Sequence, residues 1–552
     1  MISPAVWTPA DGLKLEPNAL EAAMETRQSI ALTAGPGAGK TEMLAQRADF
    51  LLRTGGCRYP RRILAISFKV DASASLRERV RRRCGLELAS RFDSHTFHAF
   101  GKRLIDRFRP VLTGADQLNP DYTVGEHRIQ GSAIEFRDLV LLALRVLTVS
   151  AYARNAIRQT YSHVFLDEFQ DCNSDQYELI CRAFHGTNTL LTAVGDTKQR
   201  IMAWAGALEG IFGRFALDFN ARGLNLYQNF RSLPRLRRMQ NAMVKIMDPQ
   251  AAVPDAELAG DGGEIITLDF PDDAQEAAAV AQEIHGWIAI DETQPAQIAV
   301  LVSKQLEQYA APLMRELSAR AIPFRNDHEI QDLASEPAAG LVVDLLRVVC
   351  GEREPDAYSR LMGVIVSGDL DEDSAYNDRA TWNSLLDSAR EQFQALSGSL
   401  AQRLNEAVRP LVSFLGPTRA AGLSAEYEHG GRFADLVSQT LSRIAEFASL
   451  YGGEVLVALR RFMGEDAVRI LTIHKSKGLE FDTVVILGVE AETFWGKADE
   501  ERSAYFVGIS RAKRRLVLTT AARRARPEGF QRRWNEVRHP HEEFLGYAAS
   551  TK

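Results

Sequence analysis

Cysteine is scarce in this sequence, with five residues among 552, and no two of them form a CxxC pair. An odd and scattered set of this kind excludes a disulfide framework and gives no support to a zinc or iron–sulfur site. Long hydrophobic runs are also missing. The longest, from Leu139 to Val149, is interrupted by Arg145 and is much shorter than the roughly 20 residues that span a bilayer. The sequence therefore predicts core thiols and no membrane helix.

The N-terminus lacks the two marks of a secretory signal, a basic flank and a continuous apolar run. We therefore expect a cytoplasmic protein. A general excess of basic residues is missing too, because the formal net charge is −6. This argues against a protein that binds polyanions over its whole surface. Hydrophobic residues at 45% and charged residues at 25% are typical of globular chains. The length is enough for about three or four compact units.

Basic residues are nevertheless concentrated in three segments. A nucleic-acid channel on an acidic body would give this pattern, and so would solvated helix surfaces, and charge alone favours neither interpretation. The clusters are Arg77, Arg79, Arg81, Arg82 and Arg83; Arg231, Arg235, Arg237 and Arg238; and the arginine-rich stretch 511–533.

Short β-favouring apolar runs alternate with helical patterns through most of the chain. One series lies at 29–34, 62–68, 163–169 and 189–196, and a second at 264–270, 297–303, 468–474, 481–489 and 515–520. Buried strands that alternate with helices are typical of parallel sheets covered by helices. We therefore predict two α/β cores. Strand signals fade between Val349 and Gly464, where helical patterns predict an insertion within the second core.

The strongest chemical signal is the segment AGPGAGKT at residues 34–41, between a predicted strand and a predicted helix. Glycines let backbone N–H groups converge on phosphate oxygens, Lys40 can reach the outer phosphates, and the Thr41 hydroxyl can bind Mg²⁺. A chance glycine turn is the alternative, but the flanking strand and helix favour a P-loop. The candidate nucleotide-binding residues here are Ala34, Gly35, Gly37, Gly39, Lys40 and Thr41.

A second signal lies in the predicted strand segment 163–169, where Asp167 and Glu168 are adjacent. A nucleotide hydrolase needs two carboxylates at such a position, one to organise Mg²⁺ and one to polarise the attacking water. An acidic pair at a strand end is otherwise usually a solvated turn. The P-loop upstream favours the catalytic interpretation, with Thr41 and Asp167 as the candidate metal ligands.

With these two motifs, the sequence resembles superfamily 1 DNA helicases of the UvrD/Rep type, from the P-loop almost to the C-terminus. The resemblance rests on motifs in the order that the family uses: LTAGPGAGKT, ILAISF, HTFHAFGKRL, IEFRDL, FLDEFQD, VGDTKQRIMAWAGA, LYQNFRS, ILTIHKSKGLEFDTVVILG and AYFVGISRAK. It implies an α/β protein with two RecA-like P-loop cores and small, mostly helical inserted subdomains. It also implies a motor that uses ATP and Mg²⁺ to move 3′ to 5′ on single-stranded or tailed duplex DNA.

The resemblance further implies roles for individual residues. Gln199 would sense the γ-phosphate, and Arg231 and Arg511 would be the two arginine fingers. Phe230 would stack on the adenine, and Glu480 would accept a hydrogen bond from the ribose. Six residues would thus be catalytic: Lys40, Asp167, Glu168, Gln199, Arg231 and Arg511. Five would contact DNA: Phe68, Thr96, His98, Trp204 and His474. For the aromatic members of this second set, a place in the buried core is the alternative.

The resemblance also divides the chain into domains. The first core would comprise residues 1–222, with a reduced insertion near 105–135, and the second core residues 223–350 and 464–536. A reduced helical insertion would occupy 351–463, and a tail 537–552. Two positions depart from the family pattern, because Ala19 stands where the family has an adenine-reading glutamine and Glu42 where an arginine often follows the P-loop. Nucleotide selectivity therefore stays open.

Two alternative functions remain at this point. The inserted subdomains are short and the chain has no recognisable nuclease motif, so it could be a DNA-sensing ATPase that regulates a separate nuclease subunit. Compact chains of this kind occur in Gabija-type anti-phage systems. A non-catalytic DNA-binding protein is the other alternative, and the presence of the six catalytic residues argues against it.

Overall fold

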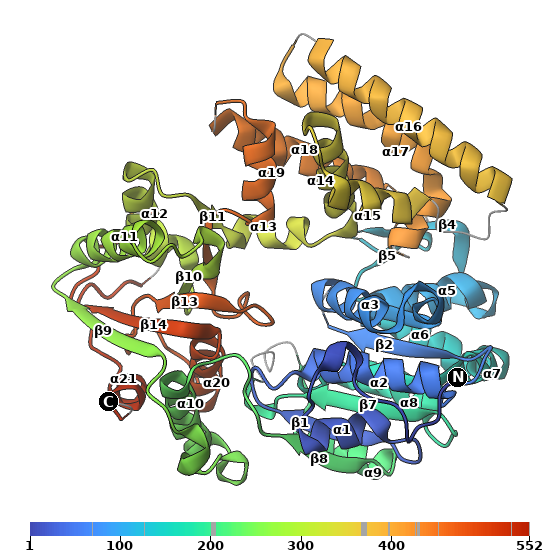
Figure 1. Ribbon diagram of the computed structural model, residues 1–552, viewed down its shortest axis with the longest axis horizontal. Coiled ribbons are helices and arrows are strands. Elements are labelled where there is room, and N and C mark those ends of the chain that lie inside the picture. The colour runs from blue at the N-terminus through green and yellow to red at the C-terminus, as the bar shows by residue number, and fades with distance from the viewer. Residues whose placement is uncertain are drawn as a thin grey trace.

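The computed structural model describes residues 1–68, 70–125, 127–199, 206–365, 372–395, 398–424, 427, 431–450, 452–531 and 533–550. Figure 1 shows two α/β cores side by side, one from the N-terminal part of the chain and one from its central and C-terminal parts, with a helical unit above them. Both cores contain a six-stranded sheet whose neighbouring strands are parallel. The predicted fold class is thereby confirmed.

The sheet of the first core has the order β3-β2-β6-β7-β1-β8. On β2, Ile63 and Ala65 pack into one apolar cluster, and Leu64 and Ile66 into another, because successive side chains of a strand point to opposite faces. Helices therefore cover both faces. The strands are β1 (Ile30–Ala34), β2 (Arg62–Ser67), β3 (Phe92–Thr96), β6 (Tyr161–Leu166), β7 (Leu190–Gly195) and β8 (Arg222–Leu226).

Helices from the N-terminal part of the chain complete the two clusters, α1, α2 and α3 on one face and α5, α6 and α8 on the other. A two-stranded insertion, β4 (Leu118–Gly125) and β5 (Gly131–Glu135), lies between α5 and α6. The helices are α1 (Pro17–Met24), α2 (Lys40–Thr54), α3 (Val70–Cys84), α4 (Leu86–Ala89), α5 (Phe97–Phe108), α6 (Asp138–Val149), α7 (Ala151–Thr160), α8 (Ser174–Phe184) and α9 (Ile211–Asp218).

The sheet of the second core has the order β11-β12-β10-β13-β14-β9. Helices α10, α20 and α21 pack on one face, and α11 and α12 on the other. The strands are β9 (Glu264–Phe270), β10 (Ile298–Val302), β11 (Phe324–Asn326), β12 (Val468–Thr472), β13 (Phe481–Ile486) and β14 (Ala512–Ala521). The helices are α10 (Pro234–Met247), α11 (Asp273–Ala289), α12 (Leu306–Ala319), α20 (Ala498–Ile509) and α21 (Glu542–Ala549).

The helical unit has an apolar core of its own, in which Leu341 and Leu345 of α14 contact the same cluster as Trp382 of α16 and Leu411 of α17. Its helices are α13 (Asp327–Ala334), α14 (Pro337–Cys350), α15 (Pro355–Ile365), α16 (Glu372–Ala395), α17 (Leu400–Leu423), α18 (Arg432–Leu450) and α19 (Val455–Met463). In Figure 1 this unit lies above the β4–β5 insertion of the first core.

Three boundaries differ from the sequence prediction. Strand β8 pairs with β1, so the first sheet continues past residue 222 to Leu226. Helix α14 packs into the helical unit, which therefore begins before residue 351. The predicted tail contains α21, whose Phe544 and Tyr547 are buried in the second core. In each case the apolar side chains of a segment decide which core it joins.

Among the described residues, no single helix has the length and apolar character of a membrane span. Helices α6 and α7 reach that character only as a pair, and the chain bends by 103° between them. Both helices contribute side chains to the apolar cluster of the first core.

Candidate ATP site and DNA interface

The P-loop lies between the end of β1 at Ala34 and the start of α2 at Lys40. Gly37 and Gly39 have φ angles of +71° and +75°, a backbone region that favours glycine. The loop therefore leads directly into the N-terminus of a helix, where free N–H groups and the helix dipole favour an anion. Lys40 and Thr41 lie in the first turn of that helix.

The connection between the two cores lies directly against the P-loop. A Cβ atom on Gly37 would lie 2.5 Å from Oδ1 of Asn229 and 2.6 Å from Cβ of Arg231. The Phe230 N–H donates to the Gly37 carbonyl at 2.9 Å, and the Phe230 ring is 63% exposed. Phe230 and Arg231 are thus held beside the phosphate-binding loop, with the aromatic ring free to stack on a base.

Strand β6 brings Asp167 and Glu168 to the same edge of the sheet. Burial and the neighbouring Glu168 carboxylate raise the pKa of Asp167 above its usual value. Burial also acts to raise the pKa of Glu168, but the ammonium groups of Lys40 and Lys477 outweigh it and lower that pKa below its usual value. The two carboxyl groups therefore differ strongly in proton affinity, and Lys40 lies within electrostatic reach of both.

Gln199 joins the two cores. Its amide Nε2 donates to Oδ2 of Asp196 at 3.0 Å, and its Oε1 accepts from Nη2 of Arg511 at 2.9 Å. Arg511 is only 2% exposed, and burial together with the nearby Arg231 lowers its pKa to about 9. Arg511 therefore stays charged at neutral pH while it reaches from the second core to the first.

Arg231 is the second basic group between the cores. Its Nε donates to Oε2 of Glu480 at 2.8 Å, and its Nη1 donates to the Ser510 carbonyl at 3.1 Å. Glu480 also forms an ion pair with Lys513 at 2.9 Å. Burial acts to raise the pKa of Glu480, but Lys513 and Arg231 lower it below its usual value. Glu480 is therefore an ionised acceptor next to an arginine in this structure.

Lys477 is a residue of this region that the sequence prediction missed. Its Nζ forms an ion pair with Asp171 and donates to the Gln199 carbonyl at 2.9 Å. Both charged side chains are nearly fully buried. The positions of Asp171 in FLDEFQD and of Lys477 in HKSKG could have identified both as candidates, because each segment contains other candidate residues. We call the contact formed by Asp171, Gln199, Arg231, Lys477 and Arg511 the seam.

The residues around the P-loop suit a nucleoside triphosphate and a divalent cation. Backbone N–H groups at the start of α2, the Lys40 ammonium and the two seam arginines supply positive charge for phosphate oxygens. The Thr41 hydroxyl and the Asp167 carboxylate are oxygen ligands of the kind that Mg²⁺ prefers. The structure thus brings together all six residues predicted to be catalytic.

The residues predicted to contact DNA are more dispersed and mostly engaged in packing. Phe68 packs edge-to-face on Phe97, with ring centroids 5.3 Å apart. Thr96 is buried and caps α5 by accepting from the Ala99 N–H at 3.1 Å. His98 stacks on a neighbouring phenylalanine at 4.0 Å, and burial lowers its pKa to about 4.

The two remaining predicted DNA contacts have different outcomes. His474 is half-buried and lies two residues beyond the end of β12. Trp204 lies outside the described residues. Phe68, Thr96 and His474 all follow or end a strand, so they lie at the carboxyl edges of the two sheets, where α/β proteins bind ligands.

Comparison with known families agrees with this geometry. The UvrD/REP helicase N-terminal domain matches residues 15–128 and 119–220, and the UvrD-like helicase C-terminal domain matches residues 224–336 and 398–523. The chain belongs to the UvrD/Rep helicase family. This helicase-family enzyme matches the N-terminal model over its first core and the C-terminal model over most of the rest of the chain.

Individual relatives of this helicase are similar over nearly their whole length. DNA helicase II of Escherichia coli is 25% identical over 95% of this chain and 86% of the relative. The ATP-dependent DNA helicase Rep of Escherichia coli is 25% identical over 93% and 91%, respectively. The ATP-dependent DNA helicase PcrA of Leuconostoc citreum is 23% identical over 91% and 81%.

Many arginines of the predicted basic clusters form ion pairs within the helicase. Arg79 and Arg83 donate to the Glu42 carboxylate at 2.8 to 3.0 Å. Arg524 is buried between Glu276 and Glu490, at 2.7 Å from each. These pairs hold elements together, so the clusters contribute less free positive surface than their sequence suggests. Glu42 and Ala19 are the two positions that depart from the family pattern, and Ala19 is buried in α1.

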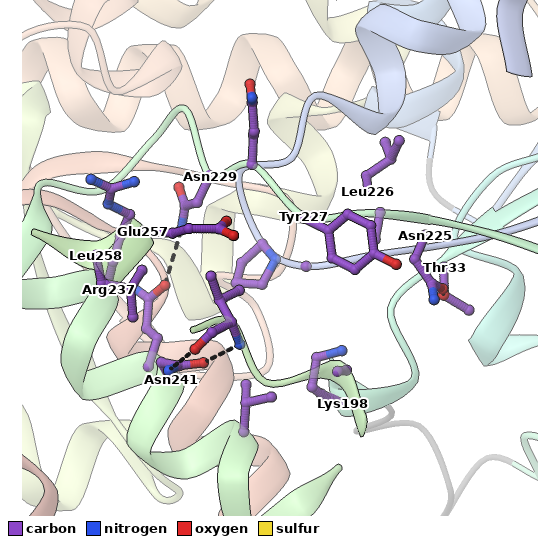
Figure 2. Close-up of a pocket in the computed structure, with 18 of the residues that line it drawn as sticks. Thr33, Lys198, Asn225, Leu226, Tyr227, Asn229, Arg237, Asn241, Glu257 and Leu258 are labelled. Carbon is purple, nitrogen blue, oxygen red and sulfur yellow. Dashed lines mark hydrogen bonds between the residues drawn. The ribbon is translucent and has the colours of Figure 1, made fainter. Parts of the chain in front are cut away.

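A cavity of about 460 Å³ extends from the first glycine of the P-loop into the space between the cores. Figure 2 shows Tyr227 and Lys198 of the first core on one side and Arg237 and Asn241 of α10 on the other. Asn241 is held by the backbone of Val253, to which it donates at 2.8 Å and from which it accepts at 2.9 Å. Because both cores line it, this cavity would change shape whenever the cores moved.

Proposed function

We propose that this chain hydrolyses ATP at the seam and uses the resulting movement of its cores to travel 3′ to 5′ along single-stranded DNA. The observation that carries the proposal is the hydrogen bond of 2.9 Å between Arg511 and Gln199. It joins a cation of one core to a side chain of the other, next to the P-loop. A change at the phosphates can therefore alter the contacts of both cores.

The proposed roles follow from the chemistry of each group. Lys40 and the two arginines, Arg231 and Arg511, would neutralise charge on the transferring phosphoryl group. Glu168, which follows β6 directly after Asp167, would orient and polarise the attacking water. Thr41 and Asp167 would hold Mg²⁺, which supplies charge neutralisation at the phosphates when bound.

Movement would follow from the geometry of the seam. Arg231 and Arg511 would approach the phosphates when ATP binds, and Gln199 would report the loss of the γ-phosphate to Arg511. The cores would then separate, since the charge that attracted both arginines is gone. Side chains along the carboxyl edges of the sheets, including Phe68 and His474, would hold the DNA in turn during this cycle.

ATP turnover measured with and without single-stranded DNA tests this proposal. We expect DNA to stimulate hydrolysis and the Lys40→Ala variant to be inactive in both conditions while it still binds DNA. Strand displacement is then measured on duplexes with a 3′ or a 5′ tail. Displacement from the 3′-tailed substrate alone would support the assigned direction. Absence of DNA-stimulated hydrolysis in the wild-type chain would contradict the motor.

A DNA-sensing ATPase that regulates a separate nuclease is the second candidate. It is favoured by the small size of the insertion between α5 and α6, which consists of β4 and β5, because little structure is available there to engage a duplex. The same assays separate the two candidates. Strong stimulation by DNA without displacement of either tailed substrate would favour the regulatory ATPase.

A further inference from the structure

An exposed tryptophan lies on the second core. Trp495 is 59% exposed, on the segment between β13 and α20. The Lys304 ammonium lies 4.3 Å from the centroid of its ring and donates to its backbone carbonyl at 2.6 Å. Lys304 in turn forms an ion pair with Glu501 of α20. The indole is therefore open to solvent but held in one place.

The position of this pair matters more than its exposure. Strand β10 pairs with β12 on one side and with β13 on the other, all in parallel. Lys304 follows the end of β10, Trp495 follows β13, and His474 follows β12. The three side chains therefore belong to one edge of the second sheet, its carboxyl edge. This is also the kind of edge where Phe68 and Thr96 lie in the first core.

The chemistry of the pair favours stacking over phosphate binding. An indole face presented to solvent can stack on any base, because every base has a π-face. A free lysine would attract phosphate, but the charge of Lys304 is balanced by Glu501 and directed at the ring. The cation fixes the ring and lies against one side of it.

We propose that Trp495, oriented by Lys304, is a stacking platform for one nucleobase of single-stranded DNA. The platform extends the DNA path of the second core beyond His474, from β12 across β10 to β13. It rests on the proposed function, because it assumes that the carboxyl edges carry DNA. The experiment must therefore separate a failure of the platform from a failure of DNA binding as such.

Binding of a fluorescently labelled oligo-dT strand, followed by anisotropy, tests the platform. Trp495→Ala is expected to weaken binding about 5- to 100-fold, the range expected for one stacked base. Trp495→Phe should restore most of the affinity, because a ring remains. Tyr59→Ala is the matched control. Tyr59 is exposed and lies near an arginine guanidinium at 5.9 Å, but it precedes β2 and so lies at the amino edge of the first sheet.

Oligonucleotides with a single abasic site, moved one position at a time, locate the base. At one position the missing base and Trp495→Ala should weaken binding no more together than either does alone. Additive losses at every position would overturn the platform. So would unchanged affinity of Trp495→Ala. A wild-type chain that binds no single-stranded DNA would instead overturn the proposed function, and the platform with it.

Discussion

The seam of this helicase and the carboxyl edges of its sheets, which we propose carry DNA, are built in opposite ways. At the seam, charged groups from distant parts of the sequence converge, as Arg511 does on Gln199 and Lys477 on Asp171. At the carboxyl edge of the first core, Thr96 serves as a helix cap and His98 as a stacking partner inside the fold. Phosphate chemistry needs groups at one point, whereas a strand of DNA is held at many weak points.

The comparison teaches where single substitutions should matter. A group that acts at one point has no substitute, so its loss should affect turnover strongly. A group that is also engaged in packing, as Thr96 and His98 are, should affect affinity little, and its clearest effect should be on stability. The following predictions test this contrast, from the largest expected effect to the smallest.

Replacing the proposed finger arginine, Arg511→Lys, should lower kcat for DNA-stimulated ATP hydrolysis about 1,000-fold, because a lysine cannot reproduce the planar set of N–H donors. KM should change little. Arg514→Lys is the matched control, since Arg514 lies close along the chain, on β14, but pairs with Asp482 at 3.0 Å. Steady-state turnover and a thermal melt of each variant are measured. A kcat equal to that of the control would remove the finger role.

Removing the buried cation, Lys477→Met, should lower the free energy of unfolding by about 3 kcal/mol, because the Asp171 carboxylate keeps its burial but loses this charge. Urea unfolding at neutral pH measures the effect. The double variant Lys477→Met with Asp171→Asn should recover part of the loss. If the two single losses simply added, the pair would not be coupled, and the seam would depend on other contacts.

Protonation of His98 should make stability depend on pH. Its folded-state pKa of about 4 lies below its ordinary value, so the unfolded chain binds a proton in the range where the folded chain does not. The contribution of neutral His98 to stability is complete above about pH 6.5 and is lost as the pH falls towards 4. At pH 5 the loss amounts to about 2 kcal/mol. Unfolding at pH 7.5 and pH 5 is compared with that of His98→Phe, which keeps the stack. An identical pH dependence in both would refute the assignment.

Loss of the cap, Thr96→Ala, should cost about 1 kcal/mol of stability, because the Ala99 N–H at the start of α5 loses its acceptor. Thr96→Ser keeps the hydroxyl and should behave like the wild-type chain. Chemical denaturation and DNA affinity are measured on both variants. A large loss of DNA affinity in Thr96→Ala at full stability would show that Thr96 acts as a direct contact, and the contrast with the seam would fail.

The fold could be predicted largely because several of its strands, such as β6 and β10, are buried on both faces. Each predicted run contains a strand, and β10 reads as a continuous apolar segment. Strands β3, β8 and β11 escaped because they are edge or near-edge strands with polar residues, as in FDSHT and RGLNL. The boundary at α14 escaped for another reason, since an apolar helix fits either core and only tertiary packing decides between them.

The candidate ATP site was more predictable than the DNA interface for a physical reason. Lys40, Asp167 and Gln199 lie on the segments that follow β1, β6 and β7, and parallel strands bring such segments together at one edge of the sheet. The Lys477–Asp171 pair could not be derived in this way, because it depends on how the two cores face each other. Burial of Thr96 likewise depends on the packing of α5.

Because Gly37 has no side chain, the segment that connects the two cores can lie directly against the P-loop. Asn229 and Arg231 occupy the volume that a methyl group would need. Any larger residue would push the connecting segment, and Arg231 with it, away from the P-loop. The position of Arg231 relative to the P-loop therefore depends on the absence of a Cβ atom at Gly37.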